Sequence, residues 1–243
     1  MQILPSDDWL CLAIGNSRLH WGKLRGKKIL ATWHTNHLST LPDFIQTLPL
    51  CIASVVPEQT NLWRKYPNVR ILQLSDIPLE GVYSTLGIDR ALAVWGAAVN
   101  YGLPCLVIDG GTALTITGVD SKKVFQGGAI LPGLKLQLMS LAQQTSALAE
   151  IQLPVCLPEQ WAINTQAAIA SGIIYTLLAG LNSFISDWLC NYPNSQICLT
   201  GGDGLLIQQY LQQGNTNNPS QLKFDGDLVL AGIADLVLTS TFK

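Results

Sequence analysis

Two carboxylates stand where acid–base or cation chemistry is possible. Asp109 ends an apolar run and is followed by Gly110 and Gly111, so its charge requires a nearby cation or hydrogen-bond donor if the strand is buried. Asp89 is followed at once by Arg90 at the start of an apolar helical segment. The residues alone favour a helix cap with an adjacent counter-charge at Asp89 and leave a catalytic carboxylate as the alternative.

Three glycine-containing turns follow predicted strands and are candidates for phosphate binding. The turns are Gly15-Asn16-Ser17, Gly110-Gly111-Thr112 and Thr200-Gly201-Gly202-Asp203. Glycine lets backbone amides approach an anion closely, and hydroxyl groups add further donors. Plain hairpin turns are the alternative, which the occurrence of three such turns disfavours. The sequence has no P-loop, no dinucleotide-binding glycine fingerprint opening a helix and no Gly-x-Ser-x-Gly elbow, which disfavours those enzyme classes.

The segments that position these turns alternate between strand and helix patterns, which indicates an α/β fold with mixed or parallel sheets. Short apolar runs bounded by turn residues predict strands at 9–14, 29–33, 51–56, 69–74, 106–109 and 196–200, with further strands starting at 19, 114 and 124. Helices are predicted at 57–66 and 89–101, from Pro132 to about 148, from an Asn164 cap to 188, and at 227–237, with a polar loop at 215–220.

A strand, a glycine turn and a second strand occur twice, and the two copies align Gly15 with Gly111. The same register gives three further pairs: Ala13 with Asp109, Asn16 with Thr112, and Gly22 with Gly118. A duplicated half changes the whole topology of a chain. The repeat predicts two related α/β halves that face each other across a cleft, with one glycine turn from each half pointing into it.

The composition limits the partners of the chain. Its 243 residues include 14 Lys and Arg and 16 Asp and Glu, giving a net charge of −2, so we expect no nucleic-acid partner. The one basic group, Lys23, Arg25, Lys27 and Lys28, is predicted to be a solvated hairpin turn. Apolar residues make up 48% of the chain and charged residues 12%, which predicts a folded protein with a large core. So few charges, together with seven Trp residues, also favour contact with a second subunit.

The residues alone indicate neither a membrane segment nor a metal centre built from cysteine or histidine ligands. The best apolar run, Leu228–Leu238, is short for a transmembrane helix and contains Asp235, and the first residues lack the pattern of a signal peptide. A cytoplasmic protein is therefore predicted. The six cysteines are far apart without a Cys-x-x-Cys pair, which favours buried reduced thiols over disulfides or metal ligands. His34 and His37 have no nearby third ligand and are weak support for a metal.

Motifs spread over most of the chain resemble those of the type III pantothenate kinases, a family of the acetate kinase, sugar kinase, Hsp70 and actin superfamily. In order, these motifs are Ile14-Gly15-Asn16-Ser17, Gly87-Ile88-Asp89-Arg90, Ile108-Asp109-Gly110-Gly111-Thr112-Ala113, Gly127-Gly128-Ala129-Ile130-Leu131-Pro132-Gly133, Asn164-Thr165 with Ala168-Ile169 and Gly172, and Thr200-Gly201-Gly202-Asp203. The resemblance implies an α/β fold of two duplicated ribonuclease H-like (actin-like) lobes whose mixed sheets face a nucleotide cleft. The expected lobes are residues 1–102, with the first phosphate turn and the pantothenate motif, and 103–243, with the second turn, a dimer helix and the nucleotide motif.

The resemblance also implies an activity: ATP-dependent phosphorylation of pantothenate to 4′-phosphopantothenate, the first step of coenzyme A synthesis. The implied cofactors are ATP with Mg²⁺ and a monovalent cation, K⁺ or NH₄⁺, and the implied assembly is a homodimer with shared active sites.

Residue roles follow from the same resemblance, which reverses the interpretation of Asp89 as a cap and makes it the proton acceptor. The implied pantothenate-binding residues are Tyr83, Gly87, Ile88, Asp89, Arg90 and, across the dimer interface, Thr165. The implied ATP-binding residues are Ala13, Ile14, Gly15, Asn16, Ser17, Arg18, Leu19, His20, Thr112, Gly201, Gly202 and Asp203. Asp109 is expected to hold the monovalent cation.

Two departures from the family pattern lie near the phosphate turns. Ala13 replaces an aspartate that helps to organise the magnesium on ATP, and Thr117 replaces a frequent aspartate in the second hairpin. We expect an active enzyme in which Ala13→Asp tightens apparent magnesium-ATP binding. The alternatives are a non-catalytic pantothenate- or nucleotide-binding regulatory protein of the same fold, and a kinase for another small hydroxylated acid.

Overall fold

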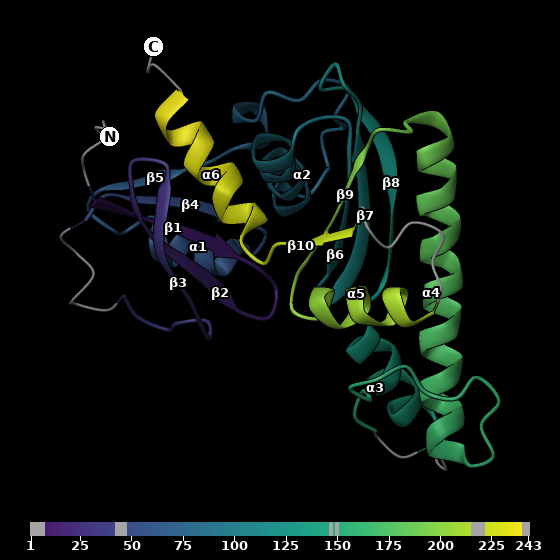
Figure 1. The fold of residues 1–243 in the computed structure, drawn as a ribbon. Helices are drawn as coiled ribbons and strands as arrows, with labels where there is room; N and C mark the ends of the chain where they lie inside the picture. The colour runs from purple at the N-terminus through teal and green to yellow at the C-terminus, as the bar shows by residue number, and fades with distance from the viewer. Residues whose placement is uncertain (1–7, 42–47, 146–147, 149–150, 215–221, 240–243) are drawn as a thin grey trace. The chain divides into compact units, whose positions relative to one another are not determined.

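The computed structural model describes residues 8–41, 48–145, 148, 151–214 and 222–239, which form two compact units (Figure 1). The first unit contains the described residues up to 102, together with 123–125 and the segment from 227 onward. The second unit contains 103–122 and the described residues of 126–226. The segment from 227 therefore packs with the first unit, whereas the sequence analysis assigned all of 103–243 to one lobe.

The first unit is built on a five-stranded mixed sheet in the order β3-β2-β1-β4-β5. Strand β1 is antiparallel to β2 and parallel to β4. The strands are β1 (Asp8–Ile14), β2 (Leu19–Arg25), β3 (Lys28–Thr35), β4 (Leu50–Ser54) and β5 (Val69–Ile71). The helices are α1 (Pro57–Trp63), the short 3-10 helix η2 (Leu74–Asp76), α2 (Ile88–Tyr101) and α6 (Leu228–Thr239).

The second unit repeats this plan with a sheet in the order β10-β9-β6-β7-β8. Its central strand β6 is antiparallel to β7 and parallel to β9, as β1 is to β2 and β4. The strands are β6 (Cys105–Gly110), β7 (Ala113–Val119), β8 (Phe125–Pro132), β9 (Gln196–Thr200) and β10 (Leu222–Phe224). The helices are α3 (Leu134–Gln144), α4 (Thr165–Asn191) and α5 (Gly204–Gln213). The predicted duplication of an α/β half is thus confirmed, and so is the fold class.

The two glycine turns differ by one residue. Residues 15–18 connect the paired Ile14 and Leu19, whereas residues 111–113 connect the paired Gly110 and Leu114. Counted from these strand ends, the position of Gly22 corresponds to Thr117, so the predicted pairing of Gly22 with Gly118 is wrong by one residue. The alignment of Gly15 with Gly111 is kept, because the shorter turn shifts only the strand that follows it.

Strand alternation in the first unit gives the sheet two packed faces. Leu10, Leu12 and Ile14 project to the face where Trp63 and Tyr66 lie, and together they form one core. On the other face, α6 approaches Cys11 and Gly22 through Leu230. The glycine at position 22 leaves the room that this approach requires, since a Cβ there would overlap neighbouring atoms.

Helices α2 and α6 touch through their backbones. A Cβ on Gly96 of α2 would overlap the carbonyl of Leu228, and a Cβ on Gly232 of α6 would overlap the carbonyl of Leu92. The contact is reciprocal: in each helix, the carbonyl that the other helix's glycine contacts lies four residues before that helix's own glycine. Helices without side chains at a crossing can approach closely, and this reciprocal pair fixes where α2 lies along α6.

Helix α4 is the long green helix of Figure 1, and it is the core helix of the second unit. The Asn164 side chain accepts a hydrogen bond from the amide of Ala167 at 2.9 Å, which confirms the predicted cap. By length and composition α4 is the one described helix that could cross a membrane. Its buried side chains, among them Ile174, Leu177 and Leu181, instead pack with those of β6, β7 and β9.

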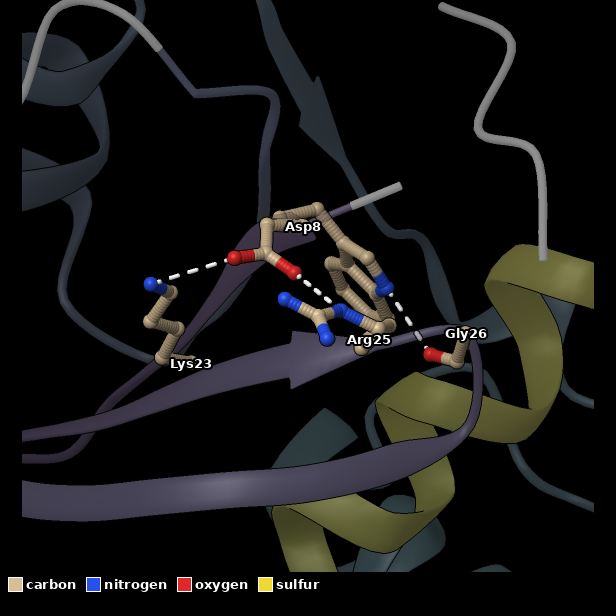
Figure 2. A network of polar contacts seen from close by, with 5 residues as sticks. Asp8, Lys23, Arg25 and Gly26 are labelled. Atoms are coloured by element: carbon tan, nitrogen blue, oxygen red, sulfur yellow. Dashed lines mark hydrogen bonds and ion pairs between the residues drawn. The ribbon is translucent and has the colours of Figure 1, made fainter. Parts of the chain in front are cut away.

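Three of the four cations in the predicted basic hairpin lie beside a carboxylate, two of them beside Asp8 (Figure 2). Lys23 and Arg25 lie 3.1 and 2.7 Å from the two carboxylate oxygens of Asp8, and Lys27 lies 2.7 Å from Asp235 of α6. The indole of Trp9 donates a hydrogen bond to the carbonyl of Gly26 in the turn itself. The positive charge of the turn is therefore partly compensated by Asp8 and Asp235.

Several sequence expectations need correction. Pro132 ends β8 instead of beginning a helix, and α3 starts at Leu134 and ends at Gln144, because the backbone is extended at Gly133 and Thr145. Two cysteines, Cys156 and Cys190, are exposed, although all six thiols are free as expected. The predicted loop at 215–220 lies outside the described residues. Helix α5 and strand β10 were not predicted.

Candidate active site

The first glycine turn is held in place from two sides. The Gly15 amide donates to the carbonyl of Arg18 at 3.1 Å, which closes the turn, and His37 Nε2 donates to the carbonyl of Gly15 at 2.8 Å. Asn16, Ser17 and Arg18 are exposed between these anchors. This part of the turn is therefore accessible to solvent. Ala13 lies one residue before the end of β1, half-buried, with His20 as its cross-strand neighbour.

A second group of predicted residues lies at the start of α2. Gly87 occupies the N-cap position and makes no side-chain bond, so the interpretation of Asp89 as the cap is wrong. The Asp89 carboxylate instead accepts a hydrogen bond from the Arg90 amide at 2.8 Å. A Cβ on Gly87 would stand 2.5 Å from the same carboxylate, which explains why glycine precedes it. Ile88, the first residue of α2, lies between them.

The charges of Asp89 and Arg90 are both shielded from water. Burial raises the pKa of the Asp89 carboxyl above its usual value, and the Arg90 amide and charge offset only part of that effect. Arg90 is 6% exposed, and its Nη1 donates to the hydroxyl of Tyr83 at 3.0 Å. Tyr83 packs edge-on against Phe125 with ring centroids 5.7 Å apart. A poorly solvated carboxylate thus lies beside a guanidinium that is fixed in direction.

In the second unit the two remaining turns meet. Asp109 and Thr200 are neighbours at the ends of β6 and β9, and the Asp203 amide donates to the carbonyl of Gly110 at 2.9 Å. Gly201 has a φ of +84°, and a Cβ on it would overlap the Asp109 carboxylate. Only glycine therefore allows this close approach of the third turn to Asp109. Gly202, next in the third turn, is exposed.

The segment after β8 closes the same cluster. The Gly133 amide donates to the carbonyl of Thr112 at 2.9 Å, which ties the second turn to the start of α3. Lys135 then lies 3.1 Å from the Asp203 carboxylate, which is 10% exposed. Sequence reasoning missed Lys135, whose only local signal is its place two residues after a motif that ends at Gly133. The ion pair compensates an otherwise buried charge.

The predicted site residues therefore fall into groups within each unit. Tyr83, Gly87, Ile88, Asp89 and Arg90 form one group, and Asp109, Thr112 and Gly201–Asp203 form another. Thr165 is exposed at the first position of α4. Among the described residues no three His, Cys, Asp or Glu side chains come close enough to hold a metal ion together. A cation at Asp109 would accordingly depend on that carboxylate with backbone oxygens, which suits a hard ion.

Comparison with known proteins identifies a family. The family model described as type III pantothenate kinase matches residues 9–187. A type III pantothenate kinase from Nostoc sp. is 42% identical, with 95% of each chain covered. One from Synechocystis sp. is 45% identical, covering 93% of this chain and 89% of the relative.

Solved structures show the same fold at low identity. A Baf family protein from Campylobacter jejuni, named as a transcriptional activator, has a TM-score of 0.65 at 21% identity and covers 94% of this chain and 96% of its own. A protein from Sinorhizobium meliloti named as a 2-dehydro-3-deoxygalactonokinase has a TM-score of 0.59 at 16% identity, covering 94% and 97%. These likenesses concern the fold alone.

Proposed function

We propose that this chain, which belongs to the type III pantothenate kinase family, transfers the terminal phosphate of ATP to the hydroxyl of pantothenate, giving 4′-phosphopantothenate in the first step of coenzyme A synthesis. The observation that carries the proposal within the structure is the half-buried Asp89 carboxylate, whose pKa burial raises, beside the fixed Arg90 guanidinium. Such a pair suits a substrate with a hydroxyl to activate and a carboxylate to bind.

In this mechanism Asp89 accepts the proton of the substrate hydroxyl as the phosphate is transferred. A carboxylate whose pKa is raised by burial is a stronger base than an ordinary one. Arg90 binds the pantothenate carboxylate, because a guanidinium matches a carboxylate in shape and charge. Tyr83 directs Arg90 and lines the same site with Gly87 and Ile88.

The glycine turns bind ATP, and catalysis depends on positioning and on neutralising phosphate charge. In the first unit, the proposed ATP-binding residues are Ala13 to His20, which offer backbone amides and the Arg18 cation. In the second unit, they are Thr112 and the segment Gly201–Asp203. Mg²⁺ would accompany ATP and would help to neutralise the phosphate charge. A monovalent cation, K⁺ or NH₄⁺, binds at Asp109. Lys135 keeps the Asp203 carboxylate paired while the nucleotide binds.

A homodimer is supported by apolar side chains that the second unit holds outward. Val155, Trp161 and Ile163 are 80%, 89% and 100% exposed. Their segment is nevertheless fastened to α4, where Tyr175 donates to the carbonyl of Pro158 at 2.9 Å and Ser171 to that of Gln160 at 2.6 Å. Exposed apolar groups on a fixed backbone are typical of an interface, and a second copy of this chain is the partner we propose. Thr165, at the head of α4, would then reach the partner's pantothenate site.

The expected environment follows from the same features. We propose a cytoplasmic enzyme without membrane or nucleic-acid partners, since α4 packs in the core of the second unit and three of the four cations of the basic turn lie beside Asp8 or Asp235.

The test is ADP release with pantothenate and magnesium-ATP, in potassium or ammonium and in sodium salts. Asp89→Asn should lower kcat by about 10²- to 10⁴-fold while the thermal midpoint is kept or raised, because the burial of the charge costs stability in the native enzyme. Glu58→Gln, on the exposed first turn of α1, is the matched control for loss of a carboxylate. Equal turnover in Asp89→Asn and the native chain would refute the assigned role.

Shared active sites have a separate test. A mixture of Asp89→Asn and Thr165→Val chains, each impaired alone, should recover part of the activity after subunit exchange, because hybrid dimers contain one intact site. Trp161→Ser should shift the mass measured by light scattering toward a monomer. A native chain that is monomeric, or a mixture without recovery, would refute the shared site.

A further inference from the structure

All three histidines of the chain gather around the first glycine turn. His37 donates to the carbonyl of Gly15 inside the turn. His20 is the second residue after the turn, and His34 is its cross-strand neighbour on β3. The rings of His20 and His34 lie with centroids 4.2 Å apart and are tilted by 35°. The sequence gives no reason for this concentration, since the three residues are spread over three elements.

The two stacked rings are linked to one carboxylate. His20 Nε2 lies 3.1 Å from the Asp227 carboxylate, which precedes α6. Thr32 on β3 also bonds this carboxylate, and the hydrogen bond from His20 is the main reason why the pKa of Asp227 lies below its usual value. The imidazole of His20 is only 15% exposed. The orientation of the His20 ring is thus set by a hydrogen-bond acceptor, as it is for many active-site histidines.

Protonation of the second ring is opposed in the free protein. Burial is the largest cause that lowers the pKa of His34, followed by the charges of His20 and Arg18. Asp227 acts in the opposite direction. On β1, Cys11 stays neutral because burial raises the pKa of its thiol well above the usual value. The pair is therefore faced by one anion, Asp227, and one cation, Arg18, in the turn that would bind phosphate.

We propose that the His20–His34 pair takes up a proton from solvent when the triphosphate of ATP binds the first turn, so that ATP affinity rises as the pH falls. This inference rests on the proposed binding of phosphates by residues 13–20. Phosphates bound at the turn would neutralise Arg18 and bring negative charge close to His20, the second residue after the turn, and to its neighbour His34. Arg18, whose charge opposed protonation of His34, is then compensated, and the phosphates favour the imidazolium form.

The direction of the pH effect follows from linkage. A group that binds more protons in the complex than in the free protein makes binding tighter at lower pH. The gain in ATP affinity develops as the pH falls through the pKa of His34 in the complex, which the phosphates raise. It is complete below the pKa of His34 in the free protein, which burial lowers. Uptake of one full proton would change the affinity by about tenfold per pH unit, and we expect a slope of roughly half that in logarithmic terms because burial still opposes protonation of His34 in the complex.

The experiment is calorimetric titration of the full chain with magnesium-ATP, without pantothenate, in two buffers of different ionisation enthalpy. The difference in heat gives the protons taken up, and we expect about half a proton near neutral pH. His34→Gln should abolish that uptake. His37→Gln is the matched control, since it removes the third histidine and the bond to Gly15 but leaves the stacked pair, and should weaken binding with the uptake intact.

The outcomes separate this inference from the proposed function. Binding heat with no proton uptake in the native chain, or with uptake unchanged in both His20→Gln and His34→Gln, would overturn the role of the pair and leave ATP binding standing. Loss of uptake in His37→Gln alone would also overturn it. No binding of magnesium-ATP at any pH, by folded protein, would instead overturn the proposed function.

Discussion

Replacing Gly201 by alanine should destabilise the protein and disturb the Asp109 cluster at the same time. The φ of +84° at this position costs a residue with a Cβ about 1–2 kcal/mol. The new Cβ would also overlap the Asp109 carboxylate and stand 2.8 Å from the carbonyl carbon of Gly110. Crowding in a packed site adds about 1–3 kcal/mol. We therefore expect Gly201→Ala to lower the free energy of unfolding by about 2–5 kcal/mol.

Gly102→Ala separates the two causes. Gly102 has a φ of +92°, but a Cβ there would meet nothing within 4 Å. Its replacement should cost only the backbone strain, about 1–3 kcal/mol. Urea denaturation at constant pH measures both variants. Equal costs would refute the contact between the third turn and Asp109.

The same variant tests the role of the cluster. Because Asp109 must move to admit the Cβ, Gly201→Ala should raise the KM for ATP and weaken the dependence on potassium or ammonium, whereas Gly102→Ala should change neither. A folded Gly201→Ala protein that keeps the native KM for ATP and the native dependence on potassium or ammonium would refute the assignment of Asp109 and the third turn to nucleotide and cation binding.

Three further substitutions have defined outcomes. Gly96→Ala should cost about 3 kcal/mol or more in urea denaturation, since the added methyl would overlap a carbonyl of α6, and a cost below 1 kcal/mol would contradict the backbone contact. Ser195→Ala leaves the buried indole N–H of Trp188 without its 2.6 Å acceptor and should cost about 1–3 kcal/mol, measured in the same way. The pKa of Asp227 is lowered mainly by His20, so its stabilising effect is present above the unfolded value and is lost as the pH falls through the lower folded value. Asp227→Asn should therefore lower the thermal midpoint near pH 6 and match the native protein in strong acid, and parallel curves would contradict this.

Glycine and other turn residues at the ends of apolar runs were enough to predict most of the strands. The glycine turns after Ile14 and Gly110 end strands that alternate or run apolar, and the duplicated order of both sheets follows from them. Short helices and strands were harder to predict from the sequence. Strand β10 has only three residues, too few for any periodicity, and Pro132 fits the end of an edge strand as well as the start of a helix.

The site was predictable where its residues are neighbours in sequence. Asp89 and Arg90 share the first turn of α2, so their proximity needs no tertiary information. The pairs Lys135–Asp203 and His20–Asp227 join residues from distant parts of the chain, and no local pattern connects them. The shielding of Asp89 likewise depends on tertiary packing, which is why composition alone favoured an ordinary helix cap.

The reciprocal glycine contact between α2 and α6 has a consequence for biosynthesis. Helix α2 carries Asp89 and Arg90 at its first turn, and α6 is made only after the whole second unit has been synthesised. Domains of a nascent chain tend to fold in the order in which they leave the ribosome. Here the first unit must wait for residues that are translated after the second unit, so the second unit can complete its sheet earlier, and the helix that carries Asp89 and Arg90 gains its final support only when translation has passed α6.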